Sequence, residues 1–410
     1  MKAGYVLLDG CGDRPDPKLN YTTPLEAAYT PNLDRLARSS KLGSVVTVGK
    51  GISPESDIAV FNMLGYSFAK GYPGRGVVEA VGAGLRFKKG DLALRANFAS
   101  AKGRKIVDRR AGRNLTQAEA GALSDELNSM RIEGAEFEFK ATVSYRAVLV
   151  IRCRDPLSAA VSNTDPAYAR VGGFGAAKET KPGEEIMKCA SEDGSLASRR
   201  AAQLVNEFTD KSLKLLAKSV VNRSRVEEGK LAANCVLLRD AGDHLPAVAP
   251  FEERYGMKGT ALVELPAEVG IAKLLKMRMV QVKDSKDMKE KASLFRKELR
   301  EGSLVYVHIK GPDEFGHDGD AVGKMRCVEA LDRDFFSTVG KLASSARIGV
   351  SCDHATPCAL KMHSDDPVPL SISSDGEPDR MRFNERNARK GSLGRLMGRD
   401  VLGKMLSTVG

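Results

Sequence analysis

The stretch "GVSCDHATPCALKMHSDDPVP", residues 349–369, joins a strand pattern to two closely spaced histidines. Its apolar start is typical of a strand buried on both faces of a parallel sheet, and it runs directly into Asp353 and His354. His363 follows, and the "DPVP" after it begins a further strand. Since the chain has only five histidines in 410 residues, this pair indicates a functional site.

Apolar runs of the same kind occur near both ends of the chain. They are "AGYVLLD" (3–9), "SLVYVHI" (303–309) and "ARIGVSC" (346–352), and helical stretches at 288–302 and 325–346 precede the last two. This alternation predicts βαβ units, hence an α/β core with a central, mostly parallel sheet. Strands with hairpin-like spacing and the helical stretches 116–130 and 195–225 fill the middle. We therefore expect a core at 1–84 and 233–410, interrupted by an inserted α+β domain at 85–232.

Composition and charge exclude several classes of protein. The chain carries a formal charge of +11 and has seven cysteines without CxxC spacing and no tryptophan. The charge fits nucleic acid or a small anionic substrate equally well, and no nucleic-acid motif is recognisable; neither ligand follows from charge alone, because a solvated basic surface is the commonest explanation. The first fifteen residues form neither a signal peptide nor a membrane span. These features predict a cytoplasmic protein with reduced thiols and no membrane partner; the glycine-rich segment 170–185 is expected to be a mobile loop.

Acidic residues and histidines follow each predicted core strand. In open α/β sheets the loops beyond the carboxyl ends of the strands form the ligand crevice, so these residues should converge. Alone, each motif is more often a surface turn or a strand-end turn, but a cluster of carboxylates and imidazoles is best stabilised by divalent cations. Mixed oxygen and nitrogen donors suit manganese or zinc better than calcium. The converging residues are Asp9, Asp313, His317, Asp353, His354 and His363, whereas His308 and His244 are expected to be structural.

Ser56, in "GISPESDIAVFNMLGY" (51–66), stands at the start of an apolar helix. Read alone it is an N-cap, which is the commoner role of serine there. A helix N-terminus also attracts phosphate, and a nearby metal would lower the pKa of the hydroxyl. Ser56 is therefore expected to be both cap and nucleophile.

Several motifs together resemble the archaeal-type cofactor-independent phosphoglycerate mutases of the alkaline phosphatase superfamily. The resemblance runs nearly end to end through "LLDGCGDRP", "SPESDIAVFNMLGY", "YPGRGVVEAVGAGL", "DRRAGR", "GPDEFGHDG", "CDHATPC...MHSDDPVP" and "KGSLGR". It implies an isomerase with a phosphatase-like core and an inserted transferase domain. Such an enzyme converts 3-phosphoglycerate to 2-phosphoglycerate through a phosphoserine, without 2,3-bisphosphoglycerate.

The resemblance also implies roles for individual residues. One metal would be held by Asp9, Ser56, Asp353 and His354, and the other by Asp313, His317 and His363. Two Mn²⁺ ions are expected, with Zn²⁺, Co²⁺ or Mg²⁺ as alternatives. Ser56 would be the nucleophile and Asp108 a general base for the substrate hydroxyl. Substrate binding would fall to Arg75, Arg109, Arg110, Arg113, Arg146, Arg239 and Lys283.

Two segments depart from the family pattern. Residues 163–170, "NTDPAYAR", lack an expected histidine, and residues 264–288 lack a "GATG" and "NT" signature, where Lys283 and Lys286 are possible substitutes. Other functions therefore stay open: a metal-dependent phosphatase or another phosphomutase of the superfamily, or a non-catalytic paralogue that binds phosphorylated metabolites. A nucleic-acid binder is the third alternative.

Overall fold

The computed structural model describes residues 2–68, 71–171, 174–177, 183–284, 286–301, 304–374 and 376–407. The chain divides into two compact units, and each is described by itself. Unit 1 comprises Met1–Ala69, Val248–Glu264 and Leu275–Gly410, and unit 2 comprises Lys70–Ala247 and Leu265–Leu274. The sequence-based range for the insert, 85–232, lies inside unit 2. Much of the expected mobile loop, 170–185, lies outside the described residues.

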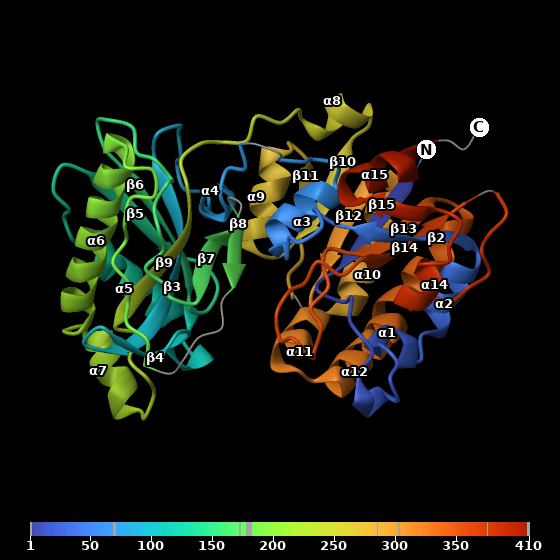
Figure 1. The fold of residues 1–410 in the computed structure, drawn as a ribbon, viewed down its shortest axis with the longest axis horizontal. Helices are drawn as coiled ribbons and strands as arrows, with labels where there is room; N and C mark the ends of the chain where they lie inside the picture. Colours follow the sequence, from blue (N-terminus) through green and yellow to red (C-terminus); the bar gives the residue numbers. More distant parts are fainter. Residues whose placement is uncertain are drawn as a thin grey trace. The chain divides into compact units, whose positions relative to one another are not determined.

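Unit 1 is built on an eight-stranded sheet, counted over the described residues (Figure 1). From edge to edge the strands are β11 (Arg278–Gln281), β10 (Gly259–Val263), β12 (Leu304–Ile309), β1 (Ala3–Leu8), β13 (Arg347–Cys352), β14 (Val368–Ser373), β2 (Ser40–Val46) and β15 (Gly394–Met397). The first five are parallel, whereas β14 is antiparallel to both its neighbours. Every residue of β1 and β12 is buried, as expected for the centre of a parallel sheet. The predicted α/β core is thereby confirmed.

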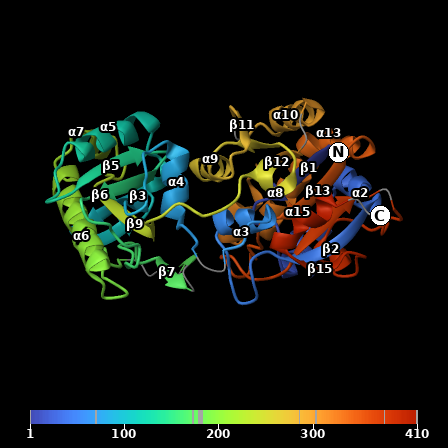
Figure 2. The same cartoon turned by 90° about the horizontal axis from the view of Figure 1, so that it is seen from above.

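Helices cover both faces of this sheet. Beside Gly4 of β1 lies Phe295 of α10, whereas beside Gly349, which is paired with Tyr5, lies Met405 of α15. Successive strand residues point to opposite faces, so α10 and α15 lie on opposite sides (Figure 2). The unit 1 helices are η1 (Pro17–Leu19), α1 (Pro24–Ala27), α2 (Pro31–Arg38), α3 (Ser56–Met63), α8 (Phe251–Tyr255), α10 (Met288–Glu301), α11 (Pro312–Asp318), α12 (Ala321–Leu331), η3 (Asp332–Phe336), α13 (Ser337–Val339), η4 (Gly340–Ser344), α14 (Glu385–Ala388) and α15 (Gly398–Leu406).

Unit 2 contains an antiparallel sheet with helices on both faces. Its strands are β3 (Leu92–Lys102), β4 (Lys105–Asp108), β5 (Glu136–Ala141), β6 (Arg146–Arg152) and β9 (Cys235–Gly242), with β7 (Tyr168–Val171) and β8 (Phe174–Ala177) as a separate pair. Its helices are α4 (Arg75–Ala83), η2 (Ala111–Arg113), α5 (Gln117–Asn128), α6 (Leu196–Leu216), α7 (Val220–Glu227) and α9 (Pro266–Leu274). Phe98 of β3 packs with α5 and α6, whereas Ala93 packs with Val77 of α4. The two sides of β3 thus face different helices, so the strand is buried on both.

Two features of unit 2 were not predicted. The helical stretch 195–225 is two helices, because Ser219 adopts extended backbone and its hydroxyl donates to Glu126. Helix α9 joins unit 2 because it packs on α4 at Gly82 and Gly270, where an added Cβ would collide with the backbone of the facing helix. The second feature depends on contacts between distant segments, which local patterns do not reveal.

In the described part of the chain, no helix has the length and apolarity needed to cross a membrane. All seven cysteines are free, and five of them are buried while Cys153 and Cys327 are partly exposed.

Candidate active site

The predicted metal-binding residues meet beyond the carboxyl ends of three central strands of the unit 1 sheet. Asp9 follows β1, α11 follows β12, and Asp353 and His354 follow β13. These three strands are parallel neighbours, so their carboxyl ends lie together. His363, in the loop before β14, completes a group in which Asp9, Asp313 and His354 place ligand atoms within 4.8 Å of one another, as do Asp313, His317 and His363.

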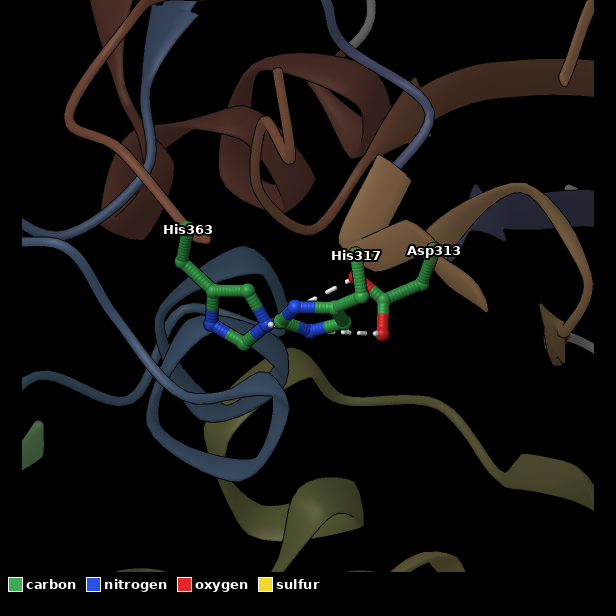
Figure 3. Close-up of side chains that lie close together, drawn as sticks. All are labelled: Asp313, His317 and His363. Atoms are coloured by element: carbon green, nitrogen blue, oxygen red, sulfur yellow. Dashed lines mark hydrogen bonds and ion pairs between the residues drawn. The ribbon is translucent and has the colours of Figure 1, made fainter. Parts of the chain in front are cut away.

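Asp313, His317 and His363 form the more exposed cluster (Figure 3). His317 Nε2 is 3.5 Å from Asp313 Oδ2, and His363 Nε2 is 3.5 Å from Asp313 Oδ1. The Nδ1 atoms of both imidazoles face carbonyl oxygens, those of Lys361 (3.1 Å) and Pro54 (2.8 Å), to which they donate. In neutral rings each Nε2 then carries only a lone pair.

The two Nε2 atoms of His317 and His363 are 3.2 Å apart. Two lone pairs at this distance repel each other, whereas a cation between them would be bound by both. The carboxylate of Asp313 places one oxygen 3.5 Å from each of these Nε2 atoms (Figure 3). This cluster therefore fits a divalent metal ion with nitrogen and oxygen ligands.

The deeper cluster contains Asp9, Ser56, Asp353 and His354. His354 Nε2 lies 3.2 Å from Ser56 Oγ, 3.3 Å from Asp353 Oδ2 and 3.6 Å from Asp9 Oδ1. The hydroxyl of Thr356 donates to Asp313 Oδ1 (2.6 Å), so at 3.1 Å it must accept from His354 Nδ1. This chain of hydrogen bonds leaves the lone pair of His354 on Nε2, facing the cluster.

The remaining oxygen atoms of the two buried carboxylates have other partners. Asp353 Oδ1 accepts the backbone N–H groups of Gly10 (3.0 Å) and His354 (2.9 Å), while Asp9 Oδ2 pairs with Lys310 Nζ at 3.0 Å. Each carboxylate thus turns its other oxygen, Asp353 Oδ2 or Asp9 Oδ1, toward the imidazoles. Such outer contacts orient metal ligands.

The electrostatics keep the carboxylates ionised. Burial raises the pKa of Asp313, but its hydrogen bond to His363 and the charges of the neighbouring histidines outweigh this, so the net pKa is well below the ordinary value. The same balance, dominated by His354 and His308, lowers the pKa of Asp353. Burial lowers the pKa of His354, whereas Asp313 outweighs burial at His363 and raises that pKa to about 9. A site that attracts a proton so strongly also attracts a metal cation, which would displace it.

Ser56 is the first residue of α3, and Glu55, not Ser56, is the N-cap residue. The expectation that Ser56 caps the helix is therefore wrong, since no side-chain cap hydrogen bond forms there. Its hydroxyl instead points into the cluster, 3.4 Å from Asp9 Oδ1. The side chain lies at a helix N-terminus and remains partly accessible, a position suited to a nucleophile that meets an anion.

Two side chains of β12 and the loop after it belong to this site although the sequence did not identify them. His308 Nε2 lies 3.1 Å from Asp353 Oδ2, and Lys310 lies beside Asp9. Both lie close to the carboxyl end of β12, the strand that leads to Asp313. This position was the only feature of the sequence that could have indicated a place in the site. The apolar run around His308 suggested a structural role instead.

Unit 2 gathers four of the predicted substrate-binding arginines into one charged network. Arg75 and Arg95 both contact Glu79 Oε1 at 2.9 Å, and Arg95 also contacts Asp240 at 3.1 Å. Burial raises the pKa of Glu79, but Arg95, Arg75 and, more weakly, Arg146 outweigh it and lower the pKa. This carboxylate is therefore ionised among several guanidinium groups.

Asp165 is the second centre of the network. Arg109 donates to both its oxygens, from Nε at 3.0 Å and Nη2 at 2.6 Å, and Arg239 Nη1 donates to Oδ2 at 3.1 Å. The guanidinium groups of Arg109 and Arg239 lie 5.3 Å and 4.3 Å from the ring centre of Tyr168. Arg239 also lies 3.5 Å from Asp240, which joins the two centres, and the network as a whole keeps a net positive charge because its four contacting arginines, Arg75, Arg95, Arg109 and Arg239, face three carboxylates, Glu79, Asp165 and Asp240.

The other predicted substrate residues are not part of this network in the described contacts. Asp108 Oδ1 accepts the backbone N–H groups of Arg110 (2.7 Å) and Gly112 (3.0 Å), so it stabilises a turn and leaves Oδ2 for other partners. Arg113 is exposed at the end of η2. Lys283 belongs to unit 1, where it is exposed in the loop after β11.

Comparisons of the sequence with known proteins identify one family. Residues 37–222 match the family described as 2,3-bisphosphoglycerate-independent phosphoglycerate mutase. The chain is 42% identical over 419 residues to the protein of that name from Aeropyrum pernix, with 97% of each chain covered. It is 40% identical to the one from Methanopyrus kandleri, covering 97% of this chain and 94% of the relative. The solved structure of cofactor-independent phosphoglycerate mutase from Thermoplasma acidophilum matches with a TM-score of 0.63 and 31% identity, covering 99% of both chains.

Proposed function

This chain belongs to the 2,3-bisphosphoglycerate-independent phosphoglycerate mutases, and from this premise we propose that it moves the phosphoryl group of phosphoglycerate between the 3- and 2-hydroxyls through Ser56. The observation that carries this proposal is the position of Ser56 Oγ, 3.2 Å from His354 Nε2 and 3.4 Å from Asp9 Oδ1, in a cluster suited to cations. A hydroxyl so placed can approach a phosphoryl group whose negative charge the same cations attract.

We assign two divalent metal ions to the donor sets already described. Asp313, His317 and His363 would hold one, while Asp9, Ser56, Asp353 and His354 would hold the other. Manganese is proposed, with zinc, cobalt or magnesium as alternatives, because the donors mix carboxylate oxygen with imidazole nitrogen. Bound metal would lower the pKa of the Ser56 hydroxyl and offset the charge of the phosphoryl oxygens.

The residues of the chain divide the chemistry. Ser56 Oγ gives up its proton and forms the bond to phosphorus as the bond from phosphorus to the 3-oxygen breaks, and the 3-oxygen of the free glycerate takes up one proton in exchange. In the second step the 2-hydroxyl gives up its proton and attacks the phosphoserine, and the departing Ser56 Oγ takes up one proton in exchange. Asp108 Oδ2 is the proposed base for this proton, since Oδ1 is engaged by backbone N–H groups.

Unit 2 supplies the groups proposed to retain glycerate between the two steps. Arg109 keeps N–H groups beyond those bound to Asp165, and Asp165 and Tyr168 hold its guanidinium in place. Arginine forks suit the substrate carboxylate. The further candidates are Arg75, Arg110, Arg113 and Arg146, and Lys283 is proposed as a phosphate contact of unit 1.

An enolase-coupled assay with 3-phosphoglycerate and Mn²⁺, run beside a measurement of phosphate release, tests this function. Formation of 2-phosphoglycerate without added 2,3-bisphosphoglycerate, and its loss on chelation, is the expected result. Phosphate release without 2-phosphoglycerate would identify a phosphatase instead. Metal and phosphoglycerate binding without either product would identify a non-catalytic paralogue. We also propose a cytoplasmic location, which the seven free cysteines favour.

A further inference from the structure

His308 is a buried histidine whose position nothing in the sequence explains. It lies in β12 opposite Leu7 of β1, and it is 2% exposed. Its Nε2 atom is 3.1 Å from Asp353 Oδ2 and 3.7 Å from Asp9 Oδ1. The three residues place ligand atoms within 4.8 Å of one another, and all three are buried.

These distances match those between atoms that share one metal ion. Ligands at roughly 2.0–2.2 Å from a metal lie about 3.0–3.6 Å apart in tetrahedral or octahedral arrangements. The distances from Asp353 Oδ2 to His308 Nε2 (3.1 Å) and to His354 Nε2 (3.3 Å) both fall in this range. Asp9 Oδ1 lies only slightly farther from both imidazoles.

A single hydrogen bond explains the arrangement less well. One N–H of His308 can point at Asp353 or at Asp9 but not at both, and Lys310, on Asp9 Oδ2, supplies one cation for two carboxylates that face each other in a buried place. A metal among Asp9 Oδ1, Asp353 Oδ2 and His308 Nε2 would satisfy all three. The backbone N–H groups on Asp353 Oδ1 and Lys310 on Asp9 Oδ2 already hold both carboxylates in that orientation.

We propose that His308 Nε2 is a ligand of the metal bound by Asp9 and Asp353, so that four of the five histidines bind metal. This rests on the proposed function only in that both require metal at this site. The inference adds a nitrogen donor, which shifts the preference of the deeper site from magnesium toward manganese, zinc or cobalt.

Cadmium-113 NMR of protein labelled with nitrogen-15 histidine counts the nitrogens bound to metal, because scalar coupling passes only through a metal–nitrogen bond. Cadmium-loaded protein should show coupling to His308, His317, His354 and His363. In His308→Gln, which keeps an N–H donor near the place of Nε2, the coupling to His308 should be absent. A wild-type spectrum with coupling to the other three histidines alone would overturn the inference.

Calorimetric titration with Mn²⁺ provides a second measure. In His308→Gln and His308→Ala the deeper site should bind Mn²⁺ more weakly by at least the roughly 10- to 100-fold that loss of an outer partner costs. In both His308 variants the more exposed site, formed by Asp313, His317 and His363, should bind Mn²⁺ with near wild-type affinity, which also shows that unit 1 is folded. His317→Gln removes a ligand of that site and so identifies its binding step in the titration. His244→Gln, in unit 2, is the matched control and should change neither site. Unchanged affinity of both sites in His308→Gln would also overturn the inference.

Failure of the proposed function gives a different result. If the wild-type protein bound fewer than two metals, the metal assignment itself would be wrong. If it bound two while coupling to His308 were absent, only the role of His308 would be wrong.

Discussion

The chemical role of the Ser56 hydroxyl can be tested without a large change in the stability of the protein. It makes no cap hydrogen bond, so Ser56→Ala should change the free energy of unfolding by well under the roughly 1 kcal/mol that loss of a true cap costs. Turnover should nevertheless be lost, because no phosphoenzyme can form. Acid quench with phosphorus-32 substrate, read beside the enolase-coupled rate, checks both points. Ser53→Ala, an exposed serine three residues earlier, is the control, and residual mutase activity in Ser56→Ala would rule out the covalent route.

Thr356 joins the two clusters through one hydroxyl, which donates to Asp313 and accepts from His354. Thr356→Val keeps the shape but removes both contacts, so His354 can turn its lone pair away from the site. Metal affinity should fall by roughly 10- to 100-fold, as for other outer partners of metal ligands. Mn²⁺ titration measures this. Thr209→Val, where a buried hydroxyl donates only to its own helix, should leave metal binding unchanged.

Gly10, directly after β1, shows how an element end shapes the site. Its φ of +55° is in the left-handed region, and an added Cβ would collide with the side chains of Asp313 and Thr356. Gly10→Ala should therefore reduce metal affinity in addition to the strain of roughly 1–2 kcal/mol. Gly256→Ala separates the two effects, because Gly256 has a φ of +63° and open space around it. Equal behaviour of the two variants in Mn²⁺ titration would contradict the collision.

The strands that carry the site could be predicted because their signal is local. β1, β12 and β13 are short apolar runs that lead into acidic residues, and the rule for parallel sheets then places Asp9 and Asp353 together. His308 was missed because an inward-facing histidine in such a run has the same pattern as a core residue. The N-cap residue is Glu55, and not Ser56 as the sequence had suggested. The residue at which a helix begins depends on backbone angles, which sequence patterns do not define to within one residue.

Contacts between distant segments set the limits of prediction for the whole chain. Strand β9 pairs with β3 across more than a hundred residues, and α9 joins unit 2 by packing on α4. No periodicity in either segment records its partner. This is why the insert predicted at 85–232 covers less of the chain than unit 2 does.

The stability of the metal-free protein should depend on one buried carboxyl, that of Glu385, which is not among the proposed metal ligands. Burial raises the pKa of Glu385 to about 7, even though Thr23 and the backbone of Asp13 donate to it. A carboxyl with a raised pKa favours folding while it is protonated, so its contribution is full below about pH 4.5 and is lost as pH rises through 7. The loss is on the order of 3 kcal/mol. Urea unfolding between pH 4.5 and 8 should show a larger loss of stability in wild type and in Glu377→Gln, an exposed control, than in Glu385→Gln, where only the other titrating groups such as His363 contribute.

The division of labour between the units leads to the last prediction. All eight proposed metal-binding residues, His308 included, belong to unit 1, whereas the arginine network belongs to unit 2. If unit 1 forms the phosphoserine and unit 2 retains glycerate, Arg109→Ala with Arg110→Ala should impair transfer to the 2-hydroxyl more than hydrolysis, because water would intercept the phosphoenzyme. Loss of a bidentate charged contact should slow transfer by a factor of roughly thirty to a hundred and fifty.

The measurement is the ratio of phosphate released to 2-phosphoglycerate formed, which should rise in the double variant. Asp165 stays paired with Arg239 in that variant, so unit 2 is expected to keep its fold. Arg104→Ala is the matched control, since this arginine also pairs with an aspartate, Asp210, but at the surface. An unchanged ratio with wild-type rates would show that Arg109 serves the packing around Asp165 and that glycerate is retained by other groups.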